Sequence, residues 1–65
     1  MKPNEILAAL MLKGIRLVDI ARRFNVTRGV VSNIIHGRTQ SRRIQAAIAK
    51  AIDKDVDEVW PQWVA

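Results

Sequence analysis

Hydrophobic residues recur along the chain with the spacing of amphipathic helices. The first such pattern places apolar residues at Ile6, Leu7, Leu10 and Met11. Asn4 is suited to cap the start of this helix, and Lys13-Gly14 has the order of a cation followed by glycine that is typical of a helix end. We therefore expect a first helix over about residues 4–13.

Two further short helices follow, separated by a tight turn. A second apolar stripe predicts a helix over about 17–24, and it consists of Leu17, Ile20, Ala21 and Phe24. Asn25 tolerates the left-handed backbone that a tight turn needs, and the Thr27 hydroxyl can cap the next helix, which ends at His36-Gly37. Two short helices joined in this way form a helix-turn-helix.

The helix over about 27–36 has two distinct faces. Its apolar arc holds Val30, Val31, Ile34 and Ile35. The opposite arc holds Arg28, Gly29, Ser32, Asn33 and His36. An ordinary surface helix would carry Lys and Glu there, whereas Arg, Ser, Asn and His are the types that bond base edges and phosphates. We interpret this segment as a helix that reads DNA.

The last third of the chain predicts two more helices. Ser41 can cap a helix whose apolar stripe is Ile44, Ala47, Ile48, Ala51 and Ile52. Asp55 and Glu58 form a capping-box pattern, which predicts a short helix over about 56–60 that Pro61 stops. Trp60 is expected to close the core, and Trp63 is suited either to the core or to a partner contact.

Composition narrows the class of protein. The chain has 65 residues, which favours a single domain over residues 1–65, and a hydrophobic content of 49% makes helix packing a sufficient source of stability. It has no Cys, so disulfides and thiolate zinc sites are excluded. No apolar run has the length of a membrane span, and the start lacks the pattern of a signal peptide. A cytoplasmic protein without membrane contact is expected.

Charge is large and unevenly placed. The formal net charge is +5, and seven arginines stand between residues 16 and 43 against one acid, Asp19. The other acids collect after Asp53, apart from Glu5 near the start. A solubilising surface would mix both signs, whereas segregated positive charge is an electrostatic footprint for a polyanion. Double-stranded DNA is therefore the expected partner.

An enzymatic site cannot be assembled from these residues. The chain lacks Cys, its one His lies on the polar arc of the helix over 27–36, and its acids do not form an opposed carboxylate pair. A lone His cannot form a metal site by itself. We expect no catalytic activity, no cofactor and no metal.

Particular residues resemble a known superfamily. Ala21 within the second helix, Val26 just past the turn, the Val31-Ser32 pair and Ile34 match the helix-turn-helix of lambda-repressor-like proteins. Asn25 stands where that superfamily usually has Gly, and Leu17 where it often has Gln. The five-helix order with its Trp-Pro ending is similar to the Ner-like regulators of transposable phages and their bacterial relatives.

This resemblance implies a fold and a function. The fold would be an all-α, compact five-helix lambda-repressor-like domain with Val31 and Ile34 buried, and with Val30 and Ile35 toward the edges of the apolar arc. The function would be that of a sequence-specific transcriptional regulator, a repressor or modulator, encoded by a bacterium or phage and associated with the nucleoid. We expect a monomer or a weak homodimer in solution, with two copies on paired half-sites.

Site residues divide into two groups by their expected contacts. Those expected at base edges are Thr27, Arg28, Gly29, Ser32, Asn33 and His36. Those expected at phosphates are Arg22, Arg23, Arg38, Thr39, Ser41, Arg42 and Arg43. Arg28 suits either bidentate contact with guanine or a phosphate clamp, and His36 suits either a nucleic-acid contact or an ordinary helix end. Val30 is placed to meet a thymine methyl group.

Two other classes of function fit the same chain. An antitoxin-like or architectural protein would use the same motif on DNA. A helical protein-interaction module would instead dock its apolar C-terminal segment on a partner, but such a module has no need of seven arginines around a helix-turn-helix.

Overall fold

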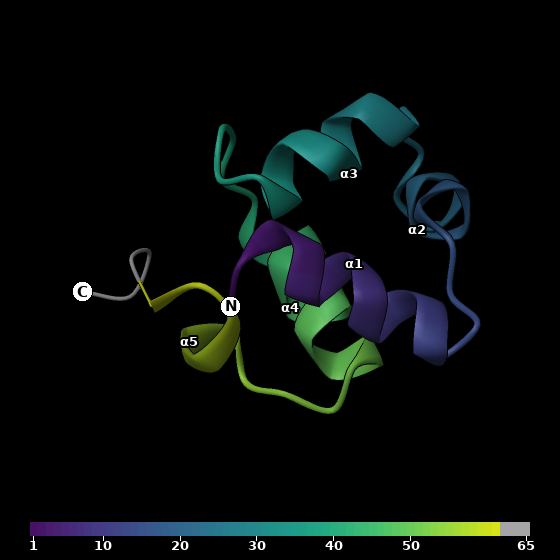
Figure 1. Ribbon diagram of the computed structural model, residues 1–65. Helices are drawn as coiled ribbons and strands as arrows, with labels where there is room; N and C mark the ends of the chain where they lie inside the picture. The colour runs from purple at the N-terminus through teal and green to yellow at the C-terminus, as the bar shows by residue number, and fades with distance from the viewer. Residues whose placement is uncertain (62–65) are drawn as a thin grey trace.

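The computed structural model describes residues 1–61, which form five helices and no strand (Figure 1). In chain order these are α1 (Pro3–Leu12), α2 (Leu17–Phe24), α3 (Arg28–Ile35), α4 (Arg42–Ala51) and α5 (Val56–Val59). The predicted all-α, five-helix class is confirmed. The role expected of Trp63 lies outside the described residues.

The first helix begins earlier than the sequence pattern indicated. Pro3 is its first residue and Lys2 its N-cap, so the prediction of Asn4 as the cap was wrong. Proline is favoured at a first helical position because its φ is already helical and no N–H is left without a partner. The backbone N–H of Lys2 donates to the Glu5 carboxylate at 2.7 Å, which satisfies one of the free groups at this end.

The turn between α2 and α3 has the predicted chemistry. Asn25 adopts φ 55° and ψ 45°, the left-handed conformation, and the Thr27 hydroxyl accepts from the backbone N–H of Val30 at 3.3 Å. The turn sends α3 across α2, and these two helices make the most extensive helix–helix contact in residues 1–61. Local backbone signals therefore set the orientation of α3.

The core draws on every helix. Its buried members are Ile6, Leu10, Ile20, Ala21, Val31, Ile34, Ile35, Ile44, Ile48, Ala49, Ile52, Val59 and Trp60. Trp60 is buried as expected, although α5 ends one residue before it. The Met1 amino group donates to the Val59 carbonyl at 2.9 Å, so the chain start lies against α5 and closes this end of the core.

Burial departs from the sequence pattern at three residues. Ile35 lies toward an edge of the apolar arc of α3 and is nevertheless buried. Met11 shares the helical spacing of the core residues, yet its side chain is 77% exposed, since no helix within residues 1–61 covers that side of α1. Gln45 is buried although it lies outside the predicted apolar stripe of α4.

Candidate nucleic-acid interface

The two faces of α3 separate as the periodicity predicted. Val31, Ile34 and Ile35 are buried, whereas the residues expected at base edges lie on the outer side. The residues at the two ends of this side are exposed, namely Thr27, Arg28, Gly29 and His36. Ser32 and Asn33, which lie between them, are half-buried. The fold therefore presents these six residues along one side of one helix.

Gly29 is not required by the fold. It lies in the first turn of α3 without a positive φ, and a Cβ added there would meet only the Thr27 hydroxyl at 3.8 Å, an ordinary contact. Glycine in a helix costs about 1 kcal/mol relative to alanine. Neither the backbone nor internal packing explains this residue, but a surface that must approach α3 closely would.

Hydrogen bonds order the second half of the polar face. One guanidinium nitrogen of Arg38 donates to the Asn33 side-chain carbonyl at 3.3 Å. The His36 ring places Nδ1 2.9 Å from the Ser32 backbone carbonyl. Because a carbonyl only accepts, Nδ1 is the donor in this contact. Arg38 thus donates to the same Asn33 oxygen that an adenine contact would use.

An aromatic ring joins two of the arginines expected at phosphates. The guanidinium of Arg23, from α2, lies 5.6 Å from the centre of the Phe24 ring, and that of Arg43, from α4, lies 5.7 Å from it. Both distances are within the range of cation–π attraction. Phe24 therefore gathers positive charge from two helices, a role that its place in the predicted apolar stripe did not reveal.

The remaining residues expected at phosphates lie in α2, in the segment between α3 and α4, and at the start of α4. Arg22, Thr39 and Arg42 are exposed, and Ser41 is half-buried. Ser41 is the N-cap residue of α4, but its side chain makes no capping hydrogen bond, so only the position predicted for it is confirmed. Arg42 and Arg43 occupy the first turn of α4, where free backbone N–H groups favour an anion.

The arginines are not neutralised within the described residues. The ion pair formed there joins Lys13 to Asp53 at 2.6 Å, at the ends of α1 and α4. Asp19, the one acid among the arginines, accepts from the backbone N–H of Arg16 at 3.1 Å. The positive charge around α3 is consequently available to an external polyanion.

Residues 1–61 contain no group of three or more acidic or histidine side chains placed to hold a metal ion. No helix among them has both the length and the apolar character needed to cross a membrane.

Comparison with known protein families matches residues 1–63 to the family described as winged helix-turn-helix DNA-binding. Comparisons with curated proteins and with solved structures give no match. A wing is a β-structure, and residues 1–61 hold none, so this chain has the helix-turn-helix of the family without a wing in its described part. The match covers nearly the whole chain and agrees with the exposed, arginine-flanked α3. The protein belongs to the winged helix-turn-helix DNA-binding family.

Proposed function

We propose that this protein is a sequence-specific transcriptional regulator, a repressor or modulator of the Ner-like, lambda-repressor-like type, that inserts α3 into the major groove of double-stranded DNA. The observation that carries this proposal is that the outer side of α3 presents polar side chains and, at Gly29, no side chain at all. The major groove admits an α-helix and displays a distinct pattern of donors and acceptors for each base pair.

Base-edge contacts begin at the N-terminal end of α3. Arg28 is exposed at its first helical position and can donate both guanidinium bonds to the O6 and N7 acceptors of guanine. The Asn33 amide matches the N6 and N7 groups of adenine. Arg38 donates to the Asn33 oxygen in the free protein, and we propose that Arg38 turns to a phosphate when DNA binds.

Phosphate contacts lie on either side of α3. Phe24 holds Arg23 and Arg43 together beside the end of α2, and Arg42 adds its charge at the start of α4. Most protein–DNA hydrogen bonds go to the backbone and fix the register of the protein without reading sequence. These arginines thus supply affinity for any duplex, and α3 supplies the preference for one.

A pair of substitutions tests this division of roles. Arg28→Ala should lose about 1–3 kcal/mol of specific binding and relax the preference at one base pair. Arg43→Ala should weaken binding to all duplexes alike and reduce the salt dependence by about one unit of slope. The measurements are selection of bound duplexes from a random library and binding isotherms over a series of salt concentrations.

Lys54→Ala provides the matched control, since Lys54 is an exposed cation outside the arginine-bearing segment. It should change neither base preference nor, appreciably, the salt slope. An Arg28→Ala variant that selects the same sequences as the parent protein would show that Arg28 is a phosphate clamp and not a reader of bases.

A further inference from the structure

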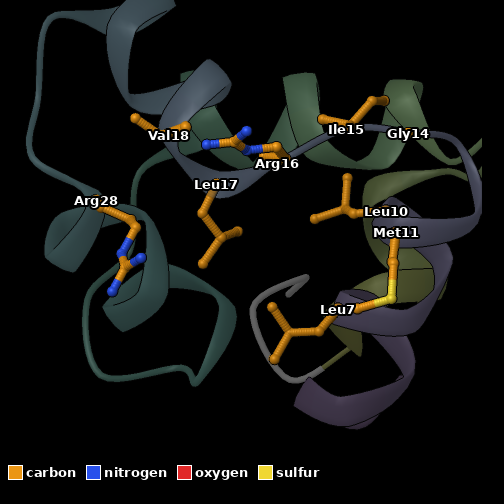
Figure 2. A pocket seen from close by; sticks show the side chains of 9 residues that line it. All are labelled: Leu7, Leu10, Met11, Gly14, Ile15, Arg16, Leu17, Val18 and Arg28. Atoms are coloured by element: carbon orange, nitrogen blue, oxygen red, sulfur yellow. The ribbon is translucent and has the colours of Figure 1, made fainter.

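An open apolar groove lies beside the N-terminal end of α3. It has a volume of about 620 Å³ and runs between the C-terminal half of α1, the α1–α2 loop, the start of α2 and Arg28. Figure 2 shows Leu7 and Leu10 of α1 pointing toward the same space as Leu17 of α2, with Arg28 on the side away from α1. The space has the size of binding sites that take apolar side chains.

Residues 1–61 cover this groove incompletely. Leu10 is fully buried beneath it, whereas Met11 on its edge is 77% exposed. Leu7, Ile15 and Leu17 are only partly buried. Methionine side chains adapt to varied apolar partners, and exposed apolar surface next to a depression marks an interaction site more often than a solvated surface.

Positive charge flanks the apolar floor. Arg16 and Arg28 both line the groove and both are exposed. Neither forms an ion pair within residues 1–61, and the nearby Asp19 carboxylate accepts from the Arg16 backbone N–H. An occupant that matches this surface has apolar side chains for the floor and carboxylates for the two guanidinium groups.

We propose that this groove docks an acidic amphipathic helix of a partner protein. Such a helix presents leucine-type side chains at i, i+3, i+4 and i+7 to the floor and carries Glu or Asp beside them for Arg16 and Arg28. A helix suits the groove because its i, i+3, i+4 and i+7 side chains share one face that can meet the apolar lining. The charges favour an acidic partner over another copy of the arginine-rich face.

Docking there would regulate DNA binding. Arg28 is a member of both surfaces: it lines the groove and begins the polar face of α3. A partner whose carboxylates hold Arg28 removes it from the major groove and adds negative charge where phosphates must approach. Partner and DNA would therefore exclude one another, a consequence that rests on the proposed function.

The test uses a labelled helical peptide and the full chain without DNA. The probe is an end-blocked, alanine-based peptide of about 15 residues with leucines at i, i+3, i+4 and i+7 and two glutamates beside them for the two arginines. One control peptide replaces the leucines by serine and keeps the charge, and a second replaces the glutamates by lysine. Fluorescence anisotropy gives the affinity, and amide chemical shifts of the protein locate the site.

Two neighbouring substitutions distinguish binding in the groove from nonspecific hydrophobic binding. Met11→Gln should lower the affinity for the peptide by about fivefold or more, because it removes apolar contact at the groove edge. Leu12→Gln should leave the peptide affinity unchanged, since Leu12 is 89% exposed and does not line the groove. Neither residue belongs to the proposed DNA interface, so both variants should bind a random-sequence duplex as the parent does.

Each result decides one part of the proposal. Tight binding of the leucine-glutamate peptide alone, with shift changes in α1 and the start of α2 and loss in Met11→Gln, supports the docking site. The docking site is overturned if either control peptide binds as tightly, or if the chemical-shift changes lie elsewhere on the protein. It is also overturned if the free protein sediments as a dimer that the Met11→Gln substitution dissociates. Peptide that fails to displace a bound duplex overturns the regulatory step. If no duplex binds while the peptide does, the proposed function fails and the docking site stands.

Discussion

Single residues on α3 differ in what holds them in place. Val31 and Ile34 are fixed by burial, and Thr27 by the hydrogen bond that caps the helix. Gly29 has no such reason, since it is exposed and a Cβ would fit. A residue that weakens its own helix and meets open space is best explained by what approaches from outside.

Gly29→Ala should therefore separate stability from binding. The free protein should become more stable by about 1 kcal/mol, because alanine is the better helix former. Binding to duplex DNA should weaken, because the added methyl group stands where the helix approaches the groove. Urea unfolding and DNA titration measure the two effects.

Ala8→Gly serves as the reverse control, since Ala8 is exposed on α1 and outside the interface. It should lower stability by about 1 kcal/mol and leave DNA affinity unchanged. If the Gly29→Ala variant binds DNA as the parent does, the hypothesis that α3 approaches the groove closely at this position is wrong.

At the scale of secondary-structure elements, helices α1 to α4 all end at a residue in the left-handed conformation. A residue with positive φ closes each one: Gly14, Asn25, Gly37 and Asp53. After α4, the Lys54 N–H donates to the Ala49 carbonyl at 2.9 Å, the bond pattern of a Schellman motif. Three of these ends follow from Gly or Asn in the sequence, whereas Asp53 gives a weaker signal and was missed.

Asp53 also forms the ion pair between the ends of α1 and α4. Its hydrogen bond and charge attraction with Lys13 lower its pKa from the ordinary value of 3.8. A carboxylate whose pKa is lower in the folded state stabilises the fold above its unfolded pKa. That contribution is lost as the pH falls from about 3.8 through the lower folded value.

Asp53→Asn should thus lower stability slightly at neutral pH, since asparagine keeps the tolerance for positive φ and removes only the charge. The variant and the parent should converge as the pH falls below 3.8. Urea unfolding over a pH series measures this. Asp57→Asn is the control for loss of an exposed carboxylate. If the Asp53→Asn variant is still less stable than the parent at low pH, its lower stability comes from the backbone and not from the lost charge.

Size and charge bear on how copies of the whole molecule could be arranged on DNA. Residues 1–61 extend 29 × 23 × 17 Å between Cα atoms, with the arginines around α3 and most acids after residue 52. Half-sites one helical turn apart are separated by about 34–36 Å. The longest Cα extent is smaller than this spacing, which is compatible with two copies side by side on one face of DNA.

We expect a monomer in solution and two copies on one duplex with paired half-sites. The contact between neighbouring copies would be small, because their centres stand farther apart than the molecule is long. Sedimentation of the free protein at micromolar concentration and of its complex with a selected duplex measures both states. A tight dimer without DNA would contradict this expectation.

The helix-turn-helix was predictable because its determinants are local. The bounds of α2, the left-handed Asn25 and the Thr27 cap all follow from residues within one turn of where they act. Burial was harder to predict, since it depends on distant segments. Ile35 is buried in a core to which all five helices contribute, and Met11 is 77% exposed although it has the same helical spacing as core residues of α1. Gln45 is buried with its amide nitrogen unpartnered within the described residues, which no periodicity would indicate.

The sequence by itself determined the order of the helices, most of their ends and the two faces of α3, because periodicity and capping act through neighbouring residues. Only the tertiary structure decided which side chains meet across helices. Arg43 reaches the Phe24 ring from α4, and Arg28 borders a groove built by α1 and α2. The physical reason is that such contacts depend on how helices pack, which is fixed by the shape of the whole core and not by any one segment.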